Sequence, residues 1–285
     1  MRQNAMSPPM PDNRTLHLTK HHGAGNDFLV LVDIDTVCPL DAALVVALCD
    51  RRFGVGADGV IRILAGGDDA DLAMELRNAD GQEAEMSGNG MRCLAQAAVD
   101  AGLVQPPTFS VSTLAGIRTV DYRPGEAAGA AVASVDMGLA TLGPDQPQQF
   151  ADRKARQVDV GNPHLVLLGP DPKDVDVAEL GLRLQGVHPG GINVEFISIG
   201  PGPDAIALRV WERGVGETQA CGTGSVAATA AARSWGLVGE TVSVHNPGGT
   251  LEVTLAAEGI RLSGPVRKVA DVTVDVPVIL GAARR

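Results

Sequence analysis

Two short segments of the chain place a small nucleophilic residue directly before a Gly-x-Gly turn. Ser87 opens SGNGMRCLAQAAVDAGLV at 87–104, and Cys221 opens CGTGSVAATAAARSWGLV at 221–238. Seven of these 18 positions are identical, and in both copies an Ala-rich helix is expected to follow the turn. If the two segments face each other, Ser87 and Cys221 are opposed proton-handling groups, which is what inversion of a carbon centre needs.

A second pair of segments supports a duplicated architecture. GNDFLV at 25–30 matches GNPHLV at 161–166 with an offset of 136, against 134 for the first pair. Nearly equal offsets in two places indicate two related halves. We therefore expect Ser87 and Cys221 to meet across a pseudo-twofold axis.

The position of Cys221 has consequences for its acidity. The first N–H groups of a helix are unpaired and create a positive field. This predicts a lowered pKa for the thiol, and the same N–H groups can hold a substrate carboxylate. The alternative is a merely buried thiol, since free cysteines are among the most buried residues. The polar residues around it favour function, because Arg213 can clamp a carboxylate and Glu212 can accept from an ammonium group.

Composition excludes several classes of protein. A net charge of -11 with only 3% aromatic residues argues against nucleic-acid binding, and no apolar run is long enough to span a membrane. Residues 1–14 contain three prolines and no apolar core of a signal peptide, so we predict a disordered tail. The cysteines lack CxxC spacing, which predicts free thiols in a reducing cytoplasm and no metal site. They are Cys38, Cys49, Cys93 and Cys221.

Each half shows many short strands and one strongly apolar helix. The small residues at 226–232 require an enclosed helix, so we expect an α+β fold of two domains. In each domain a curved, mostly antiparallel sheet or barrel wraps around a central buried helix. Strands are expected at 28–34, 71–78, 108–113, 117–122, 132–137, 164–168, 193–199, 205–212, 241–246, 250–256, 260–264 and 269–281, and helices over about 42–52, 88–101, from 175, and 222–235.

The glycine-rich stretches predict loops. Residues 51–60 are expected to be irregular, and residues 125–131 form the most linker-like stretch between the halves. The final apolar segment could pair with either half. A phosphate-binding loop is disfavoured, because GxxxxGK[ST] is absent and GAGNDF does not complete GxGxxG.

Six segments in order resemble the diaminopimelate epimerase family, from about residue 16 to beyond 250. They are HHGAGNDF (21–28), GVGADGV (54–60), RNADGQEAEMSGNGMRC (77–93), GNPH (161–164), NVEF (193–196) and ERGVGETQACGTG (212–224). This resemblance implies conversion of LL- to meso-diaminopimelate, a lysine and peptidoglycan precursor, by two cysteines and without pyridoxal phosphate or any other cofactor. It also implies a cytoplasmic homodimer acting on this small molecule. The expected domains are 15–131 plus 267–285, and 132–266.

The resemblance also assigns roles to individual residues. Cys221 matches one catalytic cysteine, Ser87 stands in the place of the other, and His164 and Glu212 match polar residues near that pair. The implied substrate-binding residues are Asn26, Asn78, Asn162, Asn193, Glu212 and Arg213, with Gly88, Asn89, Gly222 and Thr223 as the two helix-start cradles.

Ser87 departs from the family pattern. A hydroxyl is far less acidic than a thiol and is a poor general base unaided, although it can donate a proton or orient a water. Cys93 lies six residues further on, on another face of the helix, and cannot replace it. Three explanations are open: a native serine with reduced or asymmetric activity, an engineered Cys→Ser change, or one-sided chemistry such as α,β-elimination. Some members of the related proline-racemase group, which is similar in architecture, also have serine or threonine at one of the two positions.

Two other functions are therefore alternatives. One is a racemase or dehydratase acting on proline-like hydroxy amino acids. The other is an amino-acid-binding homologue in which Ser87 has impaired catalysis.

Overall fold

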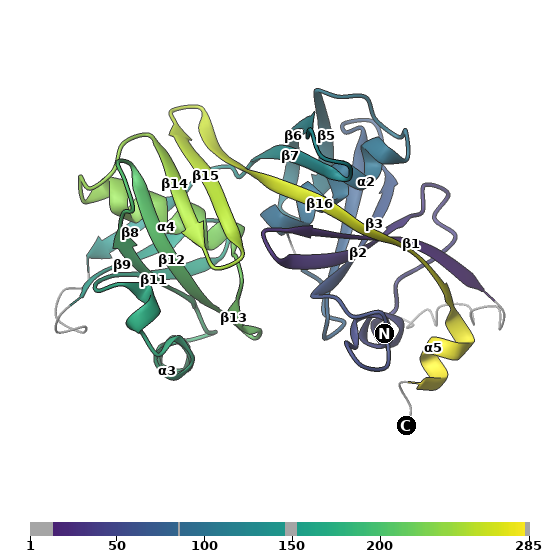
Figure 1. Cartoon of the computed structure of the whole chain (residues 1–285), viewed down its shortest axis with the longest axis horizontal. Helices are drawn as coiled ribbons and strands as arrows, with labels where there is room; N and C mark the ends of the chain where they lie inside the picture. The colour runs from purple at the N-terminus through teal and green to yellow at the C-terminus, as the bar shows by residue number, and fades with distance from the viewer. Residues whose placement is uncertain (1–13, 85, 146–152, 283–285) are drawn as a thin grey trace, which may run out of the picture.

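The protein consists of two lobes that lie side by side and share one long strand, β16 (Gly259–Asp275) (Figure 1). The structure is a computed structural model and describes residues 14–84, 86–145 and 153–282. Residues 1–13 of the predicted tail lie outside the described residues. No helix in the described ranges is long and apolar enough to cross a membrane.

The first lobe is a closed barrel. Its strands pair in the order β1-β2-β3-β4-β5-β6-β7-β16, and β16 pairs back with β1. The elements of this lobe are β1 (Thr15–Gly23), β2 (Asn26–Val32), α1 (Ala42–Cys49), β3 (Gly59–Ala65), β4 (Leu72–Asn78), α2 (Gly88–Asp100), β5 (Thr108–Thr113), β6 (Gly116–Pro124) and β7 (Ala130–Asp136).

The second lobe continues the same sheet from the beginning of β16, in the order β16-β15-β14-β12-β11-β10-β9-β8. Its elements are β8 (Thr141–Asp145), β9 (Lys154–Asp159), β10 (Pro163–Leu168), the 3-10 helix η1 (Pro172–Asp174), α3 (Val177–Val187), β11 (Asn193–Ile199), β12 (Ala205–Glu212), β13 (Gly216–Thr218), α4 (Gly222–Ser234), β14 (Thr241–Asn246) and β15 (Gly249–Ala256). The last element of the described residues is α5 (Val276–Ala282), on the first lobe.

The topology repeats between the lobes. In the first lobe β2 pairs in parallel with β3 across α1, and β4 pairs in parallel with β5 across α2. In the second lobe the parallel pairs are β10 with β11 across α3, and β12 with β14 across α4. Parallel neighbours need such helical crossovers, and the antiparallel pairs surround them. The duplication predicted from the two matching offsets is therefore present in the fold.

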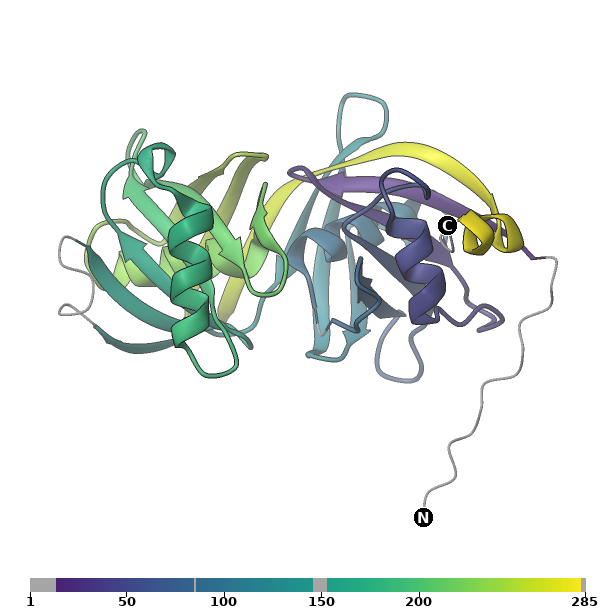
Figure 2. The ribbon, with the colours of Figure 1, turned by 90° about the horizontal axis from the view of Figure 1, so that it is seen from below.

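The central helices are enclosed, as the small residues of α4 predicted. Nearly every residue of α2 and α4 is buried, and both helices contribute to one core cluster that extends through both lobes. The outer helices cover smaller cores: α1 packs with α5, and α3 packs on β11 and β12 (Figure 2). This arrangement confirms the expected α+β fold.

Two predicted segments differ from the structure. Residues 125–131 do not connect the lobes, because β6 and β7 pair with each other on either side of a turn at this point. The strand expected at 269–281 ends at Asp275 and continues as α5, whose apolar residues Val276 and Ile279 pack against α1. The alternation of the segment predicted a strand, but burial against α1 favours a helix there.

The predicted domain boundary between residues 131 and 132 falls inside β7. Because β7 pairs with β6 and with residues 261–267 of β16, we propose that the first domain extends to Asp136. The C-terminal part of β16 pairs with β1 and so returns to this domain.

Candidate active site

Ser87 and Cys221 occupy the same local position in the two lobes. Each is the N-cap of a central helix, with extended backbone angles of φ -137°, ψ 123° for Ser87 and φ -121°, ψ 122° for Cys221. The N–H of Gly90 donates to the Ser87 hydroxyl at 3.1 Å, and the N–H of Gly224 donates to the Cys221 sulfur at 3.3 Å. Both side chains therefore cap the third N–H of a buried helix.

The two helix starts are in direct contact. A Cβ atom at Gly222 would lie 3.3 Å from the Cα atom of Gly88. The Cδ2 atom of Leu262, from the shared strand β16, would lie 2.6 Å from a Cβ at Gly88 and 2.9 Å from one at Gly222. Glycine is thus the residue that allows the helices to meet over Leu262.

A cavity of about 730 Å³ opens above this contact and is lined by both lobes. Ser87 and Cys221 line the same cavity. So does every predicted substrate-binding residue: Asn26, Asn78, Gly88, Asn89, Asn162, Asn193, Glu212, Arg213, Gly222 and Thr223. Residues that are up to 197 positions apart in the sequence therefore line one cavity. The duplicated sequence predicted this for Ser87 and Cys221, and the family resemblance implied the other residues.

His164 does not line this cavity. Its side chain is fully buried and bridges two neighbours, with Nδ1 2.7 Å from Glu195 Oε1 and Nε2 2.9 Å from Asn162 Oδ1. It is therefore connected to the cavity indirectly, through Asn162 and through Glu195.

Glu195 is a buried acid that the sequence analysis did not single out. It lies in β11, its Oε2 atom has no hydrogen-bond partner among the described residues, and burial raises the pKa of its carboxyl. A Cβ atom at Gly224 would lie 2.8 Å from Glu195 Oε1 and 3.3 Å from the Cys221 sulfur, so the acid lies close behind the thiol. The sequence feature that could have revealed it is that Glu195 is the one charged residue in the otherwise uncharged strand NVEFISI.

The expected acidity of Cys221 is wrong in this structure. Burial, followed by the carboxylates of Glu212 and Glu195, raises the pKa of the thiol well above its ordinary value. The N–H of Gly224 and the Thr223 hydroxyl act in the opposite direction but do not compensate. The helix field was predicted from local sequence, whereas the opposing carboxylates come from β11 and β12 and become visible only in the fold.

Glu212 links the thiol to the substrate side of the cavity. The Thr218 hydroxyl donates to its carboxylate, and Glu212 and the Cys221 thiol lie close enough to shift each other's pKa. Burial raises the pKa of Glu212, and the nearby Glu195 adds to this effect. A carboxyl with a raised pKa in contact with a thiol is suited to exchanging a proton with it.

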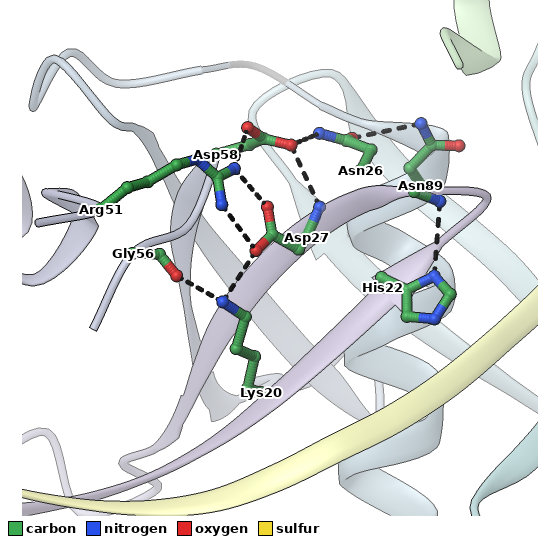
Figure 3. Close-up of polar contacts among 9 residues, drawn as sticks. Lys20, His22, Asn26, Asp27, Arg51, Gly56, Asp58 and Asn89 are labelled. Carbon is green, nitrogen blue, oxygen red and sulfur yellow. Dashed lines mark hydrogen bonds and ion pairs between the residues drawn. The ribbon is translucent and has the colours of Figure 1, made fainter. Parts of the chain in front are cut away.

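On the first lobe, a chain of hydrogen bonds fixes two asparagine side chains (Figure 3). Arg51 donates to Asp58, and the Asp58 carboxylate accepts from Asn26 Nδ2 at 2.7 Å. The oxygen of the Asn26 amide then accepts from Asn89 Nδ2 at 3.1 Å. The side chains of Asn26 and Asn89 are therefore held in defined orientations at the cavity wall.

On the second lobe, Asn193 fixes the backbone that carries Arg213. Its Nδ2 donates to the Pro163 carbonyl at 3.1 Å, and its oxygen accepts from the Arg213 N–H at 2.9 Å. The Arg213 side chain remains exposed at the cavity and packs over Gly191.

Sequence reasoning missed several polar residues of the cavity wall. Asp58, Glu83 and Thr218 lie within motifs that were recognised, but no role was given to them. Arg118, on β6, had no motif around it and is visible only in the fold.

Comparison with known proteins identifies the family. The sequence-family model described as diaminopimelate epimerase matches residues 18–143 and 156–269. The chain belongs to the diaminopimelate epimerase family.

The chain matches curated relatives of this family over nearly their whole length. Diaminopimelate epimerase of Corynebacterium glutamicum is 41% identical over 274 residues, which are 89% of this chain and 96% of the relative. That of Methanothermobacter thermautotrophicus is 37% identical over 265 residues, with 86% and 92% coverage. Membership in the diaminopimelate epimerase family thus extends over both lobes.

Solved structures share the fold at low sequence identity. A hydroxyproline epimerase from Agrobacterium vitis has a TM-score of 0.71 at 19% identity and covers 94% of this chain and 95% of its own. A Bacillus anthracis protein of the phenazine biosynthesis PhzF family has a TM-score of 0.69 at 15% identity, with 92% and 99% coverage. The two-lobed architecture of this diaminopimelate epimerase family member is therefore also found in proteins with other names.

Proposed function

We propose that the protein interconverts LL- and meso-2,6-diaminopimelate by moving a proton at one α-carbon, without pyridoxal phosphate. The observation that carries this proposal is the contact between the two helix starts. It places Ser87 and Cys221 on one cavity, each directly before a glycine of that contact. Family membership and the names of the curated relatives support diaminopimelate as the substrate.

The residues of the cavity suit a substrate with two zwitterionic ends. The reacting carboxylate is held by the free N–H groups of the helix starts, at Gly88 and Asn89 and at Gly222 and Thr223. Negative charge that develops on this carboxylate is stabilised by the same N–H groups. Arg213, Glu212 and the asparagines of the wall bind the remaining amino and carboxylate groups.

Proton transfer begins with a protonated thiol, because the pKa of Cys221 is raised in the unliganded protein. On substrate binding, the thiol gives its proton to the Glu212 carboxylate that it contacts, and the resulting thiolate removes the α-proton from one face. A proton returns to the opposite face from the Ser87 hydroxyl or from a water that this hydroxyl orients. The alkoxide or hydroxide left behind takes up a proton from solvent and Glu212 releases its proton to solvent, which restores the starting state. In the reverse direction, the thiol is the proton donor.

The two faces are unequal, because a hydroxyl is a weaker proton-handling group than a thiol. The test is incubation with separate LL and meso substrate in heavy water, with deuterium uptake and inversion measured in the same samples. Deuterium exchange at the α-carbon on the Cys221 face is expected to be faster than inversion. A folded protein that shows neither deuterium uptake nor the other isomer would contradict the proposed activity.

The same assay separates the alternatives. Turnover of trans-4-hydroxy-L-proline together with indifference to diaminopimelate would favour a proline-type racemase or dehydratase. Calorimetric binding of diaminopimelate without any exchange would favour an impaired binding protein.

We further propose that the protein acts as a cytoplasmic homodimer, on the basis of its family resemblance and its free cysteines. Sedimentation equilibrium at micromolar concentration tests the assembly. A single species of one chain's mass would contradict the dimer.

A further inference from the structure

Arg92 is a wholly buried cation directly behind the cavity wall. It lies in the second turn of α2, is 0% exposed, and is among the largest fully buried side chains. Among the described residues it forms no ion pair, and no carboxylate acts on its pKa, which burial lowers to about 10. The adjacent Cys93 cannot serve as a counter-charge, because burial raises the pKa of that thiol to about 12.

Two glycines leave space for this guanidinium group. A Cβ atom at Gly23 would lie 2.9 Å from Arg92 Nη2, and one at Gly264 would lie 3.3 Å from both Cζ and Nε. These glycines come from β1 and β16, which close the barrel around α2. A buried charge without a partner is costly, and an apolar side chain of similar size is usually at least as stable in such a place. Stability therefore does not account for Arg92.

The contacts of Arg92 lead to the active site. Helical side chains point toward the N-terminus, so the guanidinium reaches back along the first turn. Nη1 donates to the Gly88 carbonyl at 3.3 Å, and Nη2 donates to Asn89 Oδ1 at 2.8 Å. Gly88 and Asn89 line the cavity, so Arg92 is one residue layer behind it.

Asn89 in turn joins the two lobes. Because its oxygen faces Arg92, its Nδ2 atom points the other way and donates to the carbonyl of Ala220 at 2.9 Å. Ala220 directly precedes Cys221. The same Nδ2 also donates to Asn26 (Figure 3). Both of its hydrogens are therefore used. With the amide reversed, its oxygen would face the Ala220 carbonyl, and the tether would be lost.

We propose that Arg92 is a positioning residue of the epimerase reaction: it fixes the Asn89 amide that ties the α2 start to the Cys221 segment, and its buried charge is matched by the substrate carboxylate bound at the two helix starts. This inference rests on the proposed function. The positive end of α2 and the guanidinium repel each other in the unliganded protein, and an anion at the helix starts offsets both.

Three variants separate the charge from the hydrogen bonds. Arg92→Met removes both, whereas Arg92→Lys keeps the charge but loses the planar guanidinium that donates in two fixed directions. Arg123→Met is the matched control, since Arg123 is exposed on β6 and does not line the cavity. For each, we would measure kcat and KM for LL-diaminopimelate, its Kd by calorimetry, and the thermal unfolding temperature.

Arg92→Met is expected to raise KM and Kd about tenfold or more, with a lower kcat. Arg92→Lys is expected to keep Kd within about threefold of the wild type while kcat falls about tenfold, because the Asn89 amide is no longer fixed. Arg123→Met should match the wild type in kcat, KM, Kd and unfolding temperature. A purely structural Arg92 would lower the unfolding temperature of the Met variant and leave kcat, KM and Kd of the folded fraction unchanged, which would overturn the proposal.

The wild-type measurements separate this inference from the proposed function. A wild-type protein that binds diaminopimelate without deuterium exchange would contradict the proposed activity. In that case, a higher Kd in Arg92→Met than in the wild type would still support the proposal that the substrate carboxylate matches the Arg92 charge. Equal Kd values in wild type and Arg92→Met would overturn it. A wild-type protein that neither binds nor exchanges diaminopimelate would overturn both.

Discussion

Gly222 packs against Gly88, backbone to backbone, at the point where the two central helices begin. A Cβ atom added at Gly222 would lie 3.3 Å from the Gly88 Cα and 2.9 Å from Cδ2 of Leu262, which is itself fully buried. The separation between Ser87 and Cys221 therefore depends on the absence of two side chains.

Gly222→Ala is expected to destabilise the protein by about 1–3 kcal/mol, because an extra methyl group is forced into a packed site. The rate of α-proton exchange should fall about tenfold or more, since the helix starts must separate. Urea unfolding and the heavy-water assay measure the two effects. Gly186→Ala, in α3, is the control: no atom lies within 4 Å of its added Cβ, and helix propensity favours alanine by about 0.5–1 kcal/mol. Wild-type stability in Gly222→Ala would disprove the importance of the contact.

The architecture could be predicted from the sequence because short local patterns indicate it. The small residues of α4 predicted an enclosed helix, and the Gly-x-Gly turns with the nearly equal offsets of 134 and 136 predicted that the two helix starts face each other. The end of the chain was misread, because the alternating residues 269–281 do not reveal that Val276 and Ile279 pack against α1.

The electrostatics of the site could not be predicted in the same way. The raised pKa of Cys221 depends on burial and on Glu195 and Glu212, which reach the thiol from two other strands. Arg92 is visible in the motif SGNGMRC, but the direction of its guanidinium is set by the space beside Gly23 and Gly264. Both features arise from contacts between segments that are distant in the sequence.

Ser87→Cys is expected to accelerate inversion about tenfold or more, because a thiol replaces a hydroxyl on the slower face. Exchange on the Cys221 face should change much less, so the ratio of exchange to inversion should approach unity. Ser112→Cys, on β5 and away from the cavity wall, is the control for adding a thiol. An unchanged or lower inversion rate in Ser87→Cys, with the fold intact, would count against the opposed pair.

The raised pKa of Cys221 predicts slow alkylation of the unliganded protein at neutral pH. Reaction with iodoacetamide requires the thiolate, so its rate should still be rising above pH 9. Glu212→Gln removes one of the carboxylates that raise this pKa and should shift the profile to lower pH. Mass spectrometry of the Cys221 peptide follows the reaction, and the fully buried Cys93 reports any unfolding. A rate already at its plateau by pH 7 would show that the thiol pKa is lowered instead.

Asp33 is expected to make stability fall in acid. Burial alone would raise the pKa of Asp33, but the Cys38 N–H, the Arg62 guanidinium and the Val37 N–H together hold it below its ordinary value of 3.8. A folded-state pKa below the unfolded one stabilises the protein above pH 3.8, and this contribution is lost as the pH falls through the folded value.

Asp33→Asn should therefore lower the free energy of unfolding at pH 7 by about 2–3 kcal/mol, since Arg62 loses a buried partner at 2.7 Å and keeps only Glu75. The difference from the wild type should shrink as the pH approaches 3. Asp68→Asn, at an exposed position, is the control and should change stability little at either pH. Urea unfolding of the three proteins between pH 7 and pH 3 gives the comparison. A difference that stays constant over this range would mean that Asp33 acts through its shape and hydrogen bonds and not through its charge.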